Sequence, residues 1–165
     1  MKATGIVRRI DDLGRVVIPK EIRRTMRIRE GDPLEIYTDK DGGVIFKKYS
    51  LMGGVVDFAG QLCDTLNRTT GQVTVITDRD SCIASAGVPR RELMEKPISP
   101  QLERLMEGRQ IYQYKPGEPP VPLCADGEKF ALATAAPILS EGDVLGCVVF
   151  AGEAEGLSSG EVEYK

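Results

Sequence analysis

Five arginines gather in the segment Thr4–Arg24, and their chemistry is that of a site for a polyanion. They are Arg8, Arg9, Arg15, Arg23 and Arg24. A guanidinium group presents its N–H donors in a rigid fork that matches a phosphate or the edge of a guanine. The whole chain carries a formal charge of −3, so this local excess of cations is conspicuous. We predict that the segment binds a polyanion.

The charge of the chain is unevenly distributed. Residues 1–50 hold twelve Lys and Arg against eight Asp and Glu, whereas residues 51–165 hold ten against seventeen. Such asymmetry favours a basic module that meets nucleic acid and an acidic module with another task. The alternative is a solvated surface on which charges cluster at random.

Several kinds of catalytic site are excluded by composition. The 165 residues include no histidine, which rules out His-activated Ser or Cys nucleophiles and HExxH zinc chemistry. The four cysteines are far apart, without the spacing of a zinc site: Cys63, Cys82, Cys124 and Cys147. Buried free thiols are the ordinary interpretation, and a redox or ligand-contact role for Cys82 or Cys124 is the alternative. No glycine-rich phosphate loop is present either, so we expect neither an enzyme nor a cofactor nor a metal.

The cellular location is predicted from the N-terminal residues and from the lengths of the apolar stretches. Met1 and Lys2 lead directly into patterned sequence with no apolar signal core. The longest apolar stretches, such as 144–151, are too short to span a bilayer. We therefore expect a cytoplasmic protein with reduced thiols and no membrane partner.

The elements that must position the arginines are short. We predict strands at 3–10 and 15–18 around a turn at 11–14, a helix at 20–27, and a hairpin of strands 34–39 and 44–48. At about 100° per residue, the helix places its basic residues on one face and Ile22 and Met26 on the opposite face. The basic residues are Lys20, Arg23, Arg24 and Arg27. A β unit of about 50 residues buries too little apolar surface to be stable alone. We therefore predict a homodimer.

The stretch from Ala3 to Tyr37, which includes LGRVVIPKEIRR, resembles the N-terminal DNA-binding domain of the AbrB family of bacterial transition-state regulators. The resemblance covers residues 1–50 and implies a swapped-hairpin β-barrel made by two interleaved chains. It also implies binding of double-stranded DNA by Arg8, Arg15, Arg23 and Arg24, to which we add Arg9. A role in sporulation follows from it, with both activation and repression of genes.

The remaining residues have the pattern of an α+β domain, with 51–55 as a linker and 56–165 as the domain. We predict helices at 57–68, 92–95 and 99–107, and strands at 73–78, 82–86, 111–114, 130–139 and 144–151. The order resembles a GAF domain, a small-molecule sensor module. A GAF domain closes with a full C-terminal helix, whereas here only a helix start at 158–161 is visible, with Ser158 as its candidate cap.

Two roles remain open for this second domain, and two other functional classes compete with the regulator. It could hold an unidentified small molecule in a pocket, whose candidate liners are Cys82, Ala84, Tyr112, Cys124 and Thr134. It could instead serve only to pair dimers into homotetramers.

AbrB-like barrels also occur in antitoxins, but those carry a disordered tail where this chain has patterned strands. An enzyme is the other alternative, although no catalytic motif supports it.

Overall fold

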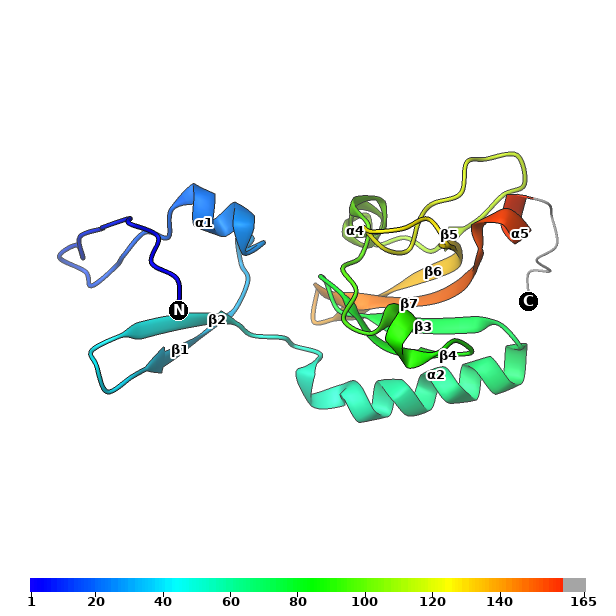
Figure 1. Ribbon diagram of the computed structural model, residues 1–165, viewed down its shortest axis with the longest axis horizontal. Helices are drawn as coiled ribbons and strands as arrows, with labels where there is room; N and C mark the ends of the chain where they lie inside the picture. The colour runs from blue at the N-terminus through cyan, green and yellow to red at the C-terminus, as the bar shows by residue number, and fades with distance from the viewer. Residues whose placement is uncertain (159–165) are drawn as a thin grey trace. The chain divides into compact units, whose positions relative to one another are not determined.

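The computed structural model describes residues 1–158, which form two compact units (Figure 1). The first unit is Met1–Tyr49 and the second begins at Ser50. Within residues 1–158, no helix is both long enough and apolar enough to cross a membrane. The architecture is mixed α and β, as the sequence predicts.

The first unit contains one helix and one hairpin. Helix α1 spans Lys20–Thr25, and strands β1 (Leu34–Thr38) and β2 (Val44–Lys48) pair antiparallel, with Leu34 opposite Lys48. The carboxylate of Asp39 closes the connecting turn by accepting hydrogen bonds from the N–H groups of Asp41 and Gly43 at 3.0 and 2.7 Å. This hairpin agrees with the prediction.

Two predictions for this unit were wrong. Residues 1–19 form no strand, although 3–10 and 15–18 have strand-like sequences, because a strand is stable only with a neighbour to complete its hydrogen bonds. Helix α1 also ends two residues early. Arg27 has a φ of 54°, and the Ile28 and Arg27 N–H groups bond back to the Arg23 and Arg24 carbonyls at 2.8 and 3.2 Å. This is a Schellman ending, and it removes Arg27 from the predicted basic stripe.

The first unit has no apolar core of its own. Among residues 1–49, only Pro19 is buried. The large apolar side chains instead lie exposed, among them Ile6, Val7, Ile10, Leu13, Val16, Val17, Met26, Ile36, Val44 and Phe46. Within residues 1–158 the buried apolar side chains begin at Met52.

The second unit is built on a five-stranded antiparallel sheet in the order β4-β3-β7-β6-β5. Its strands are Val73–Thr77 (β3), Cys82–Ala86 (β4), Tyr112–Gln113 (β5), Phe130–Ser140 (β6) and Asp143–Glu153 (β7). Its helices are Gly53–Val55 (η1, a 3₁₀ turn), Val56–Thr70 (α2), Arg90–Leu93 (α3), Pro100–Glu107 (α4) and Ala154–Ser158 (α5).

Each face of the sheet buries a separate apolar cluster. Because side chains alternate along β3, Val75 packs into one cluster and Ile76 into the other. The Ile76 side is covered by α2, which contributes Ala59 and Cys63. The Val75 side is covered by α4 and the connecting loops, including Leu102. Figure 1 shows α2 and α4 on opposite sides of the sheet.

The end of the described chain differs from the prediction. Helix α5 begins at Ala154, four residues before the predicted start at Ser158. Leu157 lies buried in a small cluster with Tyr114 and Ala133, and this packing fixes the helix against β6. The predicted continuation at 159–161 lies outside the described residues.

Candidate nucleic-acid interface and regulatory cavity

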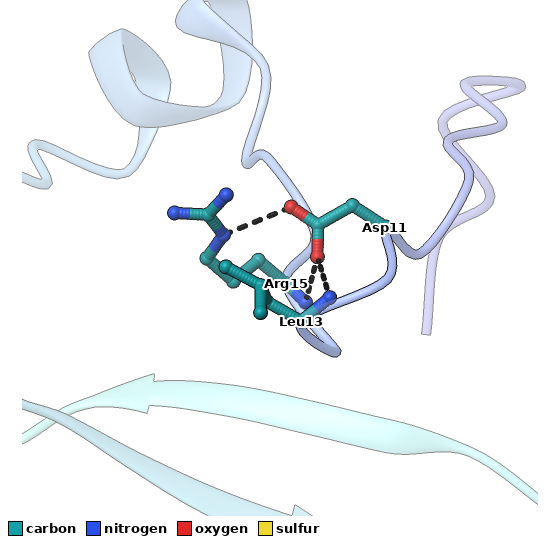
Figure 2. A network of polar contacts seen from close by, with 3 residues as sticks. All are labelled: Asp11, Leu13 and Arg15. Carbon is teal, nitrogen blue, oxygen red and sulfur yellow. Dashed lines mark hydrogen bonds and ion pairs between the residues drawn. The ribbon is translucent and has the colours of Figure 1, made fainter.

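Arg15 is held at the first turn by Asp11 (Figure 2). The Asp11 carboxylate accepts hydrogen bonds from the N–H groups of Leu13 and Arg15, at 2.9 and 2.8 Å, through one oxygen. Its other oxygen accepts from Nε of Arg15 at 2.8 Å. The Asp11 N–H in turn donates to the Arg15 carbonyl at 3.0 Å. One acidic side chain therefore closes the turn and orients the arginine.

The same contacts explain the electrostatics of this turn. The backbone hydrogen bond from Arg15, then its guanidinium, hold the pKa of the Asp11 carboxyl below its ordinary value. The Arg15 side chain is nevertheless 69% exposed, so solvent screens this ion pair. Nε alone meets Asp11, and the two Nη atoms extend beyond the pair (Figure 2).

Two arginines lie on α1, which begins at a proline. Pro19 is the N-cap residue of α1, and its carbonyl accepts from the Arg23 N–H at 3.0 Å. Nε of Arg23 donates to the Ile18 carbonyl at 3.1 Å, so this side chain lies back along the entry to the helix. Arg24 follows it, and both are exposed.

The other two predicted arginines lie before the turn. Arg8 and Arg9 are exposed, and Nη1 of Arg8 donates to the Val7 carbonyl at 3.1 Å. The five arginines thus occupy residues 8–9, the 11–15 turn and α1, all within a unit whose apolar side chains are also exposed. The role of Asp11 as the partner of Arg15 was missed from sequence. The spacing of four residues across a turn was its only signal.

A cavity of about 250 Å³ lies in the second unit, beside the loop that precedes β6. It is bounded by side chains of 91–96 on one side and 124–130 on the other, with three cations among them. The cations are Arg91, Lys96 and Lys129, and the anions are Glu92 and Asp126. Lys129 and Glu92 form an ion pair at 2.9 Å. None of these charged residues was predicted from sequence.

Of the five predicted pocket liners, only Cys124 bounds this cavity. The structure separates two of the others by a β-bulge: Thr77 pairs with Cys82, but Ile76 pairs with Ala84. Cys82 therefore joins the cluster under α4, whereas Ala84 joins the cluster under α2. A bulge inserts a residue that the alternation of a sequence does not reveal.

The remaining two predicted liners lie on the far part of the sheet. Tyr112 pairs with Ala135 and Thr134 pairs with Gln113, both where β5 meets β6. Neither bounds the cavity. Of the five predicted liners, Cys124 bounds this cavity, and a ligand pocket at these residues stays a prediction.

Cys82 and Cys124 are in side-chain contact. The hydrogen bond from the Cys82 thiol lowers the pKa of Cys124, with a further contribution from Lys96, and burial opposes both. The same bond, followed by burial, raises the pKa of Cys82. Burial also raises the pKa of Cys63 to about 11 and that of Cys147 to about 12. The pKa of Cys124 is therefore lowered, whereas the pKa values of the other three thiols are raised.

Comparison with known proteins identifies the family. The family described as "Stage V sporulation protein T C-terminal, transcription factor" matches residues 54–165. Stage V sporulation protein T of Bacillus subtilis (strain 168) is 48% identical over 165 residues, which are 100% of this chain and 92% of that protein. The chain belongs to the stage V sporulation protein T family of transcription factors.

The first unit of this family member matches a second group of proteins. Transition state regulatory protein AbrB of B. subtilis is 65% identical over 49 residues, which are 30% of this chain and 50% of that protein. The family described as "Antidote-toxin recognition MazE, bacterial antitoxin" matches residues 7–51. The solution structure of the N-domain of the transcription factor AbrB is 63% identical, with a TM-score of 0.28, and covers 30% of this chain and 92% of that one. The resemblance to AbrB is confirmed.

Proposed function

We propose that this sporulation transcription regulator binds double-stranded DNA as an interleaved homodimer, through arginines supplied by both chains. One observation supports the proposal above the others: the first unit exposes its arginines and its apolar side chains together. Val7 is 85% exposed and Val17 is 70% exposed. Such apolar exposure is unstable in water unless another surface covers it.

A second copy of the same chain is the partner that these residues fit. Residues 3–10 and 15–18 have the composition of strands but form none in a single chain. Two intertwined copies would supply the missing strand neighbours and bury the apolar side chains in a shared swapped-hairpin barrel. Each barrel would then carry ten arginines of the predicted set, five from each chain.

The proposed DNA contact relies on the backbone and shape of the duplex more than on base sequence. Helix α1 has only six residues, so residues 1–49 contain no long recognition helix to fill a major groove. Arg15, Arg23 and Arg24 would contact phosphates and reach nearby base edges as forks. Affinity would fall steeply as salt increases, because each neutralised phosphate releases counterions.

The second unit would provide regulation through a GAF-like fold. Its α2 begins with exposed apolar side chains, of which Phe58 is 65% exposed and Val56 is 37% exposed. We propose that this apolar end pairs dimers into a homotetramer, which raises the effective concentration of DNA-binding units. The cavity beside Cys124 is the proposed site for a small-molecule signal, through which the regulator activates some genes and represses others.

The antitoxin alternative rests on the match of residues 7–51 to the MazE family. An antitoxin of that kind wraps its toxin with a disordered tail. Here residues 50–158 form a compact unit with its own buried core. The described structure therefore favours the regulator over the antitoxin.

Arginine substitutions test the DNA contact. The test uses DNA duplexes selected from a random pool with the unmodified protein. Arg23→Ala and Arg24→Ala should each weaken binding to these duplexes at least fivefold, which is about 1 kcal/mol. Arg104→Ala, on α4 of the second unit, is the matched control and should leave affinity unchanged. Fluorescence anisotropy at two salt concentrations measures the affinities, and circular dichroism checks that each variant is folded. Unchanged affinity in both α1 variants would remove these arginines from the interface.

Light scattering tests the assembly independently of DNA. We expect a tetramer from the unmodified chain and a dimer from Phe58→Ser, whose DNA-binding unit is intact. If the unmodified chain is a dimer at all concentrations up to the solubility limit, the tetramer is refuted and the dimeric regulator stands.

A further inference from the structure

Two of the four cysteines are brought together by a short segment that lies between them. The Cys82 N–H donates to the Lys96 carbonyl at 3.0 Å, and its carbonyl accepts from the Glu95 N–H at 2.9 Å. Two residues further along, Ile98 forms an antiparallel bridge with Cys124. Residues 95–98 therefore fix both cysteines, which are distant in sequence, and both side chains pack in the same buried cluster.

The two thiols differ in their access to solvent. Cys124 bounds the cavity of about 250 Å³, whose volume holds several water-sized molecules. Cys82 is 0% exposed and belongs to the buried cluster that Cys124 also joins. A small reagent entering the cavity would meet Cys124, whereas Cys82 does not bound the cavity.

We propose that Cys124 and Cys82 form a redox-active pair that responds to hydroperoxides. In the first step the Cys124 thiolate attacks a peroxide oxygen, the O–O bond breaks, and alcohol or water leaves as the sulfur becomes a sulfenic acid. In the second step Cys82 attacks that sulfur, and its thiol proton leaves with the hydroxyl as water. Two electrons pass from the pair of thiols to the peroxide, and one disulfide forms.

The charges around the cavity support this order of events. The thiolate is the nucleophile in such reactions, and the Cys82 thiol and Lys96 together favour the thiolate at Cys124, against burial and Asp126. The other charges that bound the cavity are Arg91, Glu92 and Lys129, the last two joined as an ion pair. Cys63 and Cys147 are buried thiols that burial keeps protonated near neutral pH.

The loop that carries Cys124 has space in which to move. Forming a disulfide brings the two sulfurs to about 2.05 Å, which is closer than hydrogen-bond contact. Cys124 belongs to the same buried cluster as Cys82 and also bounds the cavity. Oxidation would therefore draw residues 124–130 toward β4 and reshape the cavity, whether or not a ligand occupies it.

Peptide mapping of the whole reduced chain tests the proposal without any substitution. Hydrogen peroxide is added for increasing times, remaining thiols are blocked with N-ethylmaleimide, and each cysteine peptide is quantified by mass spectrometry. We expect the Cys124 thiol to be lost at least tenfold faster than the Cys63 and Cys147 thiols. The product should be a crosslink between the Cys82 and Cys124 peptides, two hydrogens lighter than their sum.

Variants assign the two roles. In Cys82→Ser the oxidised Cys124 should persist as a sulfenic acid that dimedone traps, whereas in Cys124→Ser the Cys82 thiol should survive the same exposure. Cys63→Ser is the matched control and should retain the crosslink. Equal oxidation rates at all four cysteines of the unmodified chain, or a fast loss of Cys124 that yields only links between chains, would overturn the proposal. Neither outcome would bear on DNA binding.

Discussion

Gly146 of β7 lies so close to β3 that no other residue fits in its place. A Cβ atom built on Gly146 overlaps the Thr77 carbonyl oxygen, and it lies 2.9 Å from the Thr77 carbonyl carbon and 3.1 Å from the Asp78 Cα. All three are backbone atoms, so no side-chain rotation relieves the overlap. Thr77 is 0% exposed and pairs with Cys147, so the two strands must separate if a methyl group is added.

The size of the effect follows from this geometry. Overpacking a well-packed core costs about 1–3 kcal/mol, and separating the ends of β3 and β7 forfeits at least one ladder hydrogen bond of about 1 kcal/mol. We therefore expect Gly146→Ala to lower the free energy of unfolding by about 2–4 kcal/mol. A domain of this kind has about 5–15 kcal/mol in total, so the change is large.

Gly60 is the matched control, because a methyl group added there meets no close neighbour from another element. It lies inside α2, and a Cβ atom added there would have no atom within 4 Å apart from its chain neighbours and the backbone of its own helix. Gly60→Ala should therefore raise the free energy of unfolding by about 0.5–1 kcal/mol, because alanine loses less backbone entropy in a helix. Urea unfolding followed by circular dichroism, at one protomer concentration, compares both variants with the parent. A Gly146→Ala protein within 0.5 kcal/mol of the parent would refute the close-approach argument.

Two further substitutions test local structure in the second unit, each by the same urea titration. Glu141 and Gly142 form the two-residue turn between β6 and β7, with φ of 49° and 86°. Because Asn-Gly suits such turns, Glu141→Asn should raise the free energy of unfolding by about 0.5–1 kcal/mol. A loss of stability would show that the turn does not limit the hairpin. Ser99 caps α4 by accepting from the Leu102 N–H at 3.0 Å and donates to the Pro122 carbonyl at 2.6 Å. Ser99→Ala should cost about 2 kcal/mol, because it removes a cap and leaves the partly buried Pro122 carbonyl without its donor. A cost below 0.5 kcal/mol would contradict this.

The elements that sequence predicted well are those with strong alternation or strong caps. Strands β4 and β2 have the predicted bounds, at Cys82–Ala86 and Val44–Lys48. Helix α4 follows its Ser99 cap and begins at Pro100, as the sequence indicates. In these segments local propensity and tertiary packing favour the same structure.

The elements that sequence predicted badly depend on information outside the local pattern. An arginine at position 27 ends α1 in a conformation that usually favours glycine, so no signal marked the end. The bulge opposite Ile76 sends Cys82 and Ala84 to opposite faces, which their spacing of two residues does not reveal. The cavity was missed because its charged residues come from two separate segments, 91–96 and 124–130, which have no shared pattern in sequence.

The contrast between the two units leads to a last prediction. The second unit buries its apolar side chains within one chain, whereas the first buries only Pro19 among residues 1–49. If a partner chain completes the first unit, its stability depends on protomer concentration, while that of the second does not. Hydrogen exchange of the intact chain, measured over a thousandfold dilution, separates the two cases. Protection of the β1 and β2 amides should fall as the protein is diluted, and protection in β3 and β7 should persist. Equal protection of both units at every concentration would mean that the first unit is stable without a partner.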